Sequence, residues 1–177
     1  KVPKRKSYNI GAFWARQDAP FPYVQKGVND MATYPVEQVA EWFLRYAEIV
    51  GCDDLSNLKL QKLLYYAQSA HLAEFNGEPL FSEPILAWNH GPVVESIWRK
   101  YTKYGNAPIP ADKEVDLSGI FEPADETELE QVFELFGQYS PWSLRNRTHD
   151  ELPWKSTPRN HVIAPELMRE YFSENYL

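Results

Sequence analysis

The chain has 177 residues with a formal net charge of −7, and it contains six Trp, eleven Tyr and nine Phe. This length suffices for one domain with a substantial apolar core, and the single cysteine, Cys52, excludes an internal disulfide. Residues 1–30 carry a net charge of +4, which leaves −11 on residues 31–177. The acidic body disfavours nucleic-acid binding and either favours a basic protein partner or serves solubility alone. No apolar run reaches about 20 residues, so we expect a cytoplasmic protein with no membrane partner.

Residues 1–30 show neither helical nor alternating periodicity and contain three prolines. We therefore expect an extended N-terminal arm. Its origin is uncertain, because Met31 and the two residues after it resemble a natural translation start. The remaining residues, 31–177, would form the folded domain. Four aromatic residues are the expected anchors of the arm on the domain or on a partner: Phe13, Trp14, Phe21 and Tyr23.

Two helices are predicted in the first part of the domain. Apolar residues at helical spacing predict a helix over 35–50, with Thr33 as its cap and Gly51 as its end. A second helix is predicted over 56–76. This second helix is apolar around most of its circumference, which is typical of a central helix surrounded by others.

Within the second helix, Leu64 and Ala67 are predicted to lie in the core, and Leu64→Ala is expected to cost about 2–5 kcal/mol. Lys59 and Lys62 share one face of this helix, and we interpret that face as a solvated edge. His71 lies on a helical face and is interpreted as a semi-buried histidine with a hydrogen-bond partner rather than as a ligand.

The middle of the chain predicts a short strand or hairpin arm over 78–89 and a helix from Pro92 to residue 104. His90 would then precede a helix N-terminus, where it could help to hold an anion. The alternative, which we favour, is a structural turn in which Gly91 supplies the backbone conformation. Residues 106–124 are expected to form a loop with a short strand over 114–117.

Three further helical segments are predicted towards the C-terminus. A helix over 126–139 is followed by a helix start at Ser140. The run from Thr148 to Glu151 has the pattern of a capping box, so that two short helices would lie end to end. The last helix is predicted over 165–175. The expected fold is mainly α: a compact bundle of about five helices around a central buried helix, with a small β-hairpin.

The four histidines and one cysteine match no metal-binding spacing, and the sequence has no phosphate-binding loop and no nucleophile elbow. We therefore expect no cofactor and no metal. His149 would act as a catalytic base only with a nucleophile and an orienting group within reach, so a structural or partner-contacting role is favoured.

Four motifs occur in order along the chain: KLQKLLYYAQ at 59–68, GEPLF at 77–81, AWNHGPV at 87–93 and THDELPW at 148–154. In this order they resemble the Panacea domain, the family of the SocA-like antitoxins and of related phage-associated proteins. The resemblance extends over about residues 34–177. It implies a mainly helical fold and a role as the antitoxin of a type II toxin–antitoxin pair, which neutralises a toxin by direct binding. It carries no catalytic residues across.

The hypothesis from the sequence is an antitoxin-like protein, not an enzyme, that neutralises a cognate toxin by stoichiometric binding; whether it forms a homodimer stays open. One alternative is an adaptor that delivers a toxin to an AAA+ protease, as one member of the family does. Another is an enzyme that uses His90 and His149 together with Glu151. The candidate partner-binding residues are Trp14, Tyr65, Trp88, His90, Trp98 and His149.

Overall fold

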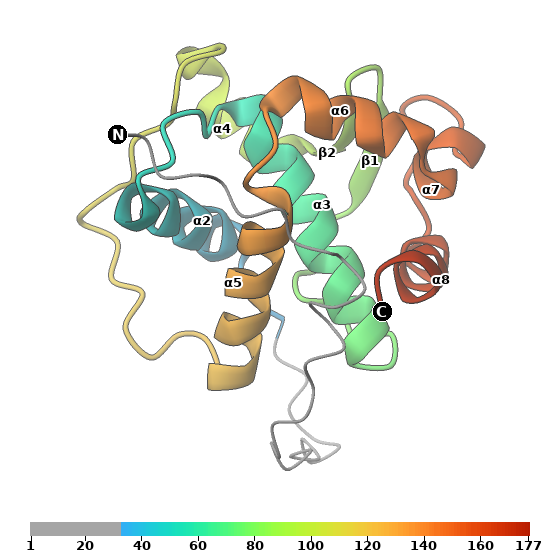
Figure 1. The fold of residues 1–177 in the computed structure, drawn as a ribbon, viewed down its shortest axis with the longest axis horizontal. Coiled ribbons are helices and arrows are strands. Elements are labelled where there is room, and N and C mark those ends of the chain that lie inside the picture. Colours follow the sequence, from blue (N-terminus) through green and yellow to red (C-terminus); the bar gives the residue numbers. More distant parts are fainter. Residues whose placement is uncertain (1–32) are drawn as a thin grey trace, which may run out of the picture.

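The computed structural model of the chain describes residues 33–177 (Figure 1). The predicted arm over 1–30, including Trp14, lies outside the described residues. The described part is mainly helical with one two-stranded antiparallel sheet, which confirms the predicted fold class. In chain order its elements are α2 (Val36–Val50), α3 (Asn57–Glu74), β1 (Ile85–Trp88), β2 (Gly91–Val94), α4 (Glu95–Tyr101), the 3₁₀ helix η1 (Thr102–Tyr104), α5 (Pro123–Phe136), α6 (Pro141–Asp150), α7 (Leu152–Ser156) and α8 (Pro165–Asn175).

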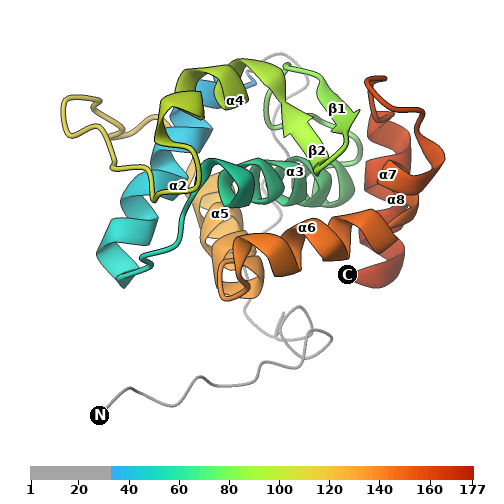
Figure 2. The ribbon, with the colours of Figure 1, turned by 90° about the horizontal axis from the view of Figure 1, so that it is seen from above.

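Helix α3 is the centre of the molecule, and α2, α5, α6, α8 and β2 all pack against it (Figures 1 and 2). Leu64 and Ala67 have no exposed surface, as predicted. The prediction for Lys59 and Lys62 is wrong, because these side chains are only 1% and 0% exposed. Charged side chains rarely enter a protein interior unless partners hold them: Lys59 pairs with Asp54, and Lys62 donates to the Pro92 carbonyl.

The ends of α2 and α3 follow local backbone rules. Gly51 ends α2 in the left-handed region, with φ of 71°, a conformation that glycine adopts without steric cost. At the end of α3, the N–H of Gly77 donates to the carbonyl of Leu72 at 2.7 Å. The cap predicted for Thr33 is wrong, since Pro35 is the residue before α2 and no side chain caps this helix.

The β1–β2 hairpin replaces the helix start predicted at Pro92. Ile85 pairs with Val94, and Trp88 pairs with Gly91 across a tight turn. Pro92 lies in β2, and α4 begins only at Glu95, so His90 lies in the hairpin turn and not at a helix N-terminus. The helix-dipole anion site considered for His90 is therefore wrong, and the favoured interpretation, a structural turn at Gly91, agrees with the φ of 99° at that residue.

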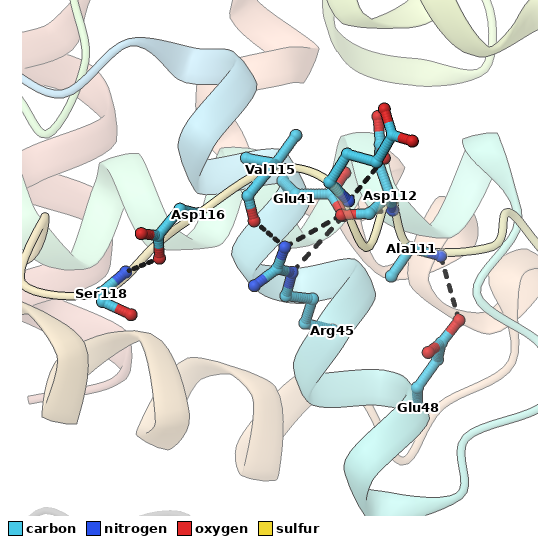
Figure 3. A network of polar contacts seen from close by, with 9 residues as sticks. Glu41, Arg45, Glu48, Ala111, Asp112, Val115, Asp116 and Ser118 are labelled. Atoms are coloured by element: carbon cyan, nitrogen blue, oxygen red, sulfur yellow. Dashed lines mark hydrogen bonds and ion pairs between the residues drawn. The ribbon is translucent and has the colours of Figure 1, made fainter.

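The strand predicted over 114–117 is also wrong, because this part of the loop after η1 pairs with no strand. Side chains of α2 hold the loop by its backbone instead (Figure 3). Glu41 and Glu48 each accept one backbone N–H, at 2.5 and 3.0 Å, while Arg45 donates to two carbonyls within 111–115. The loop thus gains order from side-chain hydrogen bonds, which a search for periodicity does not detect.

Helices α6 and α7 follow one another almost directly, as predicted. The Oγ of Ser140 accepts the Ser143 N–H at 3.2 Å and caps α6. The capping box is wrong: Thr148 lies in the last turn of α6, where its Oγ1 donates to the Arg145 carbonyl at 2.9 Å. Glu151 is the residue before α7, and its side chain is buried in the core. Helix α8 has the predicted bounds.

Candidate functional site

Glu151 lies in the interior of the molecule beside three tyrosine hydroxyls. Tyr66 and Tyr176 each donate to Oε1 at 2.7 Å, and Tyr65 donates to Oε2 at 3.0 Å. Burial raises the pKa of the Glu151 carboxyl, although the three hydrogen bonds oppose this shift. Tyr65, a candidate for partner binding, is 2% exposed and is placed in this network.

Other polar side chains of α3 hold neighbouring segments by their backbone. Gln61 accepts the Val94 N–H at 2.9 Å, and Lys62 donates to the Pro92 carbonyl at 2.9 Å. Gln68 accepts the N–H groups of residues 80 and 81 at 3.0 and 3.2 Å. The polar residues of the motif at 59–68 therefore position the hairpin and the segment before it, because a buried backbone group needs a partner.

His71 and Glu74 in the C-terminal half of α3 form a cluster with Glu128 of α5. His71 is buried, and its Nδ1 lies 2.8 Å from Oε2 of Glu128 on α5, which agrees with the interpretation of His71 as a partnered histidine. Burial and the neighbouring Glu128 carboxylate raise the pKa of Glu74 to about 7, while His71 opposes this shift. The cluster joins α3 to α5.

Around the hairpin turn lies a group of five side chains that we name the hairpin surface: Trp88, His90, Trp98, Trp142 and His149. The Trp88 and Trp98 rings meet edge to face, 5.2 Å apart, and both residues are half-buried. The exposed His90 ring lies perpendicular to Trp142, at 5.9 Å between centroids. Four of the six residues predicted to bind a partner thus lie close to this turn.

His149 is held by stacking. Its ring lies 3.6 Å from the Trp154 ring at an angle of 22°, and Trp154 Nε1 donates to the Trp88 carbonyl at 2.9 Å. Burial, together with the nearby Arg145, Lys62, Arg159 and His90 side chains, lowers the pKa of His149 to about 4. His149 is therefore neutral at neutral pH.

The geometry gives His149 no catalytic partner among the described residues. Its Nε2 is buried without a hydrogen-bond partner, and Glu151, the acid invoked in the enzyme hypothesis, is engaged by tyrosines instead. A base also acts best with a pKa near the working pH, and the pKa of His149 is about 4. Among the described residues, His149 is therefore not placed to act as a general base.

The sequence interpretation missed Trp142, which it treated only as part of a helix start. Trp142 is 60% exposed, whereas Leu144 and Thr148 on the same helix are fully buried. The exposure of Trp142 could have been predicted from helix geometry. Residues four apart, such as Leu144 and Thr148, share a face, and Trp142 lies two positions before Leu144, on the opposite side. A large exposed aromatic is informative because few large apolar side chains of the described part remain in water.

Two searches of the structure for other kinds of site gave negative results. In residues 33–177 no group of three or more His, Cys, Asp or Glu side chains is placed to hold a metal ion. Within the same part of the chain, no helix has the length and hydropathy needed to cross a bilayer.

Comparison with known proteins gives one match. No curated protein matches the chain, and no solved structure matches it. The family described as "Antitoxin SocA-like, Panacea domain" matches residues 60–155, which is more than half of the chain. These residues contain nearly all of α3, the hairpin surface and Glu151, and they lie within the span of the resemblance noted in the sequence. The chain belongs to the SocA-like antitoxin family, as a Panacea-domain protein.

Proposed function

We propose that this protein neutralises a cognate protein toxin by stoichiometric binding rather than by catalysis, and that the hairpin surface contacts the toxin. The observation that carries the proposal is the 60% exposure of Trp142 beside the hairpin turn, inside the region that matches the antitoxin family. Trp and Arg are the residues that most often dominate binding energy at protein interfaces. Arg145 adds such a group, with its guanidinium 6.0 Å from the Trp142 ring centroid.

The charge around Trp142 indicates the chemistry of the toxin surface. Arg145, His90 and Arg159 lie close enough to His149 to lower its pKa, so this part of an otherwise acidic chain is locally cationic. An acidic patch with an apolar centre on the toxin would complement it, because complementary charge speeds encounter and rejects wrong partners. For this surface the proposal replaces the basic partner that net charge alone had left open beside a role in solubility.

The proposal is tested by titrating the toxin encoded beside this gene with purified protein, using calorimetry and rescue of growth. Trp142→Ala is expected to weaken binding at least tenfold while the protein stays folded. Ile49→Ala is the matched control, since Ile49 is 80% exposed but lies on α2, outside the matched region. Equal effects of the two substitutions would contradict the assignment of the surface.

The same titration separates binding from catalysis. Neutralisation that saturates at one antitoxin per toxin and survives both His90→Gln and His149→Gln is the expected result. Neutralisation by far less than one equivalent, lost with either substitution, would contradict stoichiometric binding and support the enzyme hypothesis.

A further inference from the structure

Lys62 is a fully buried cation with a single hydrogen-bond acceptor. Its Nζ donates to the Pro92 carbonyl at 2.9 Å, although an ammonium group offers three donors. Only glycine fits beside it: a Cβ at position 91 would lie 2.7 Å from Lys62 Cε and 2.9 Å from its Nζ. The turn at Gly91 therefore closes tightly over the amine and leaves it within the protein.

Two further cationic or polar donors of α6 lie near Lys62 and are also incompletely satisfied. Arg145 Nε and His149 Nε2 are buried without a hydrogen-bond partner. In residues 33–177, the ion pairs involve other cations, and none joins a carboxylate to Lys62, Arg145 or His149. Helix α6 packs against both α3 and β2 (Figure 2). A Cβ at position 91 would lie 2.9 Å from Lys62 Nζ and 2.9 Å from Thr148 Oγ1, so the last turn of α6 lies beside the amine.

The electrostatic coupling between these groups supports their proximity. Burial and, to a smaller extent, the charge of Arg145 lower the pKa of Lys62 to about 7. Arg145, Lys62 and Arg159 also contribute to the lowered pKa of His149. A buried cation without a carboxylate partner is costly, so an anion bound between the hairpin turn and α6 would stabilise the charged forms of Lys62 and Arg145.

We propose that Lys62, Arg145 and His149 form a binding site for an oxyanion, a carboxylate or a phosphoryl group, between the hairpin turn and α6. Arg145 and His149 are partly exposed, whereas Lys62 is fully buried behind them. The guanidinium binds an oxyanion through directed N–H groups, and a neutral His149 still has one ring N–H to donate. The site is a property of this chain alone and does not depend on the toxin-binding proposal.

The test uses the full-length protein without toxin and two probes of constant charge between pH 6 and 9. Sulfate represents a phosphoryl group, and acetate represents a carboxylate. Binding is followed at constant ionic strength by the NMR signals of the His149 ring, assigned with His149→Gln, and by calorimetry. The expected result is a saturable shift with at least one probe; sulfate alone identifies a phosphoryl ligand, and acetate binding identifies a carboxylate.

Matched variants make the result specific. Lys62→Met and Arg145→Gln are each expected to weaken binding at least tenfold, whereas Arg99→Gln, at an exposed arginine paired with Glu95, leaves it unchanged. Binding is also expected to weaken from pH 6 to pH 9, as Lys62 loses its proton. Absence of a saturable shift with either probe, or wild-type affinity in a folded Arg145→Gln protein, would overturn the proposal.

Discussion

The hydroxyl of Tyr66 donates to Oε1 of Glu151 at 2.7 Å, across 85 positions of sequence. This bond joins the central helix to the residue that precedes α7, and the rings of Tyr66 and Phe136 stack 3.7 Å apart beside it. Because the carboxylate is only 2% exposed, its three hydroxyl partners take the place of water. The pair fixes the C-terminal helices on α3.

Glu151→Gln is expected to lower the free energy of unfolding by about 2–4 kcal/mol, because the amide replaces one accepting oxygen by a donor in a cluster of hydroxyl donors. Tyr65→Phe, which removes a single hydroxyl and keeps the ring, should cost only about 1 kcal/mol. Urea denaturation at pH 7 measures both. Equal costs would show that Tyr66 and Tyr176 are not coupled through the carboxylate.

Gly91→Ala is expected to cost about 3 kcal/mol or more, because residue 91 has φ of 99° and its new Cβ would overlap Lys62. Gly51→Ala is the matched control: its φ is 71°, but no atom lies within 4 Å of the added Cβ. The control should cost about 1 kcal/mol from backbone strain alone. Thermal melts of the two variants give the difference, and a Gly91 variant no worse than the control would contradict the packing at this turn.

Stability should rise with pH between about 7 and 10, with Lys62 as a main cause. Its pKa falls from 10.5 in the unfolded chain to about 7 in the fold, so in this range the unfolded chain binds more protons and each pH unit adds up to about 1.4 kcal/mol. Lys62→Met should remove this slope in urea titrations from pH 7 to 9.5. Above pH 10 stability should fall, since the pKa values of Tyr65 and Tyr66 are raised and their ionisation opposes folding.

Glu74→Gln is expected to stabilise the protein by about 1–2 kcal/mol at pH 8 and to have no effect at pH 4. Because the pKa of Glu74 is about 7 in the fold and 4.5 in the unfolded chain, the unfolded chain ionises first, and stability is lost as pH rises from 4.5 to 7. Glu134→Gln, on the exposed side of α5, is the control. Stabilisation by both variants would indicate a general charge effect rather than this cluster.

Apolar periodicity predicted α2, α5, α8 and the central position of α3, because burial of an apolar face decides these elements. The errors arose where polar side chains decide the structure. Pro92 looked like a helix start, yet Gln61 and Lys62 of α3 bond to the backbone around it and hold an extended strand. Such contacts link residues about 30 positions apart, and no local pattern records them.

Tertiary contacts also explain which residues of the candidate site were predicted from the sequence and which were missed. His90 and His149 were noticed because their residue types can carry chemistry, and Trp88 because it belongs to a motif. The coupling of Lys62 to α6 was invisible, since the spacing of Lys59 and Lys62 is equally typical of a solvated face. Local pattern gives a residue its helix and phase, whereas its partner comes from the tertiary fold.

The polar side chains of α3 form their hydrogen bonds within the protein interior, and this affects which surface substitutions the protein tolerates. Trp142 and His90 make none of the hydrogen bonds by which α3 holds the hairpin and Glu151. Their replacement therefore leaves the scaffold intact, and a new recognition specificity can arise on the hairpin surface without a stability penalty to overcome first. A protein built in this way is a suitable starting point for directed evolution of new binding partners, with diversity confined to the turn and the outer face of α6.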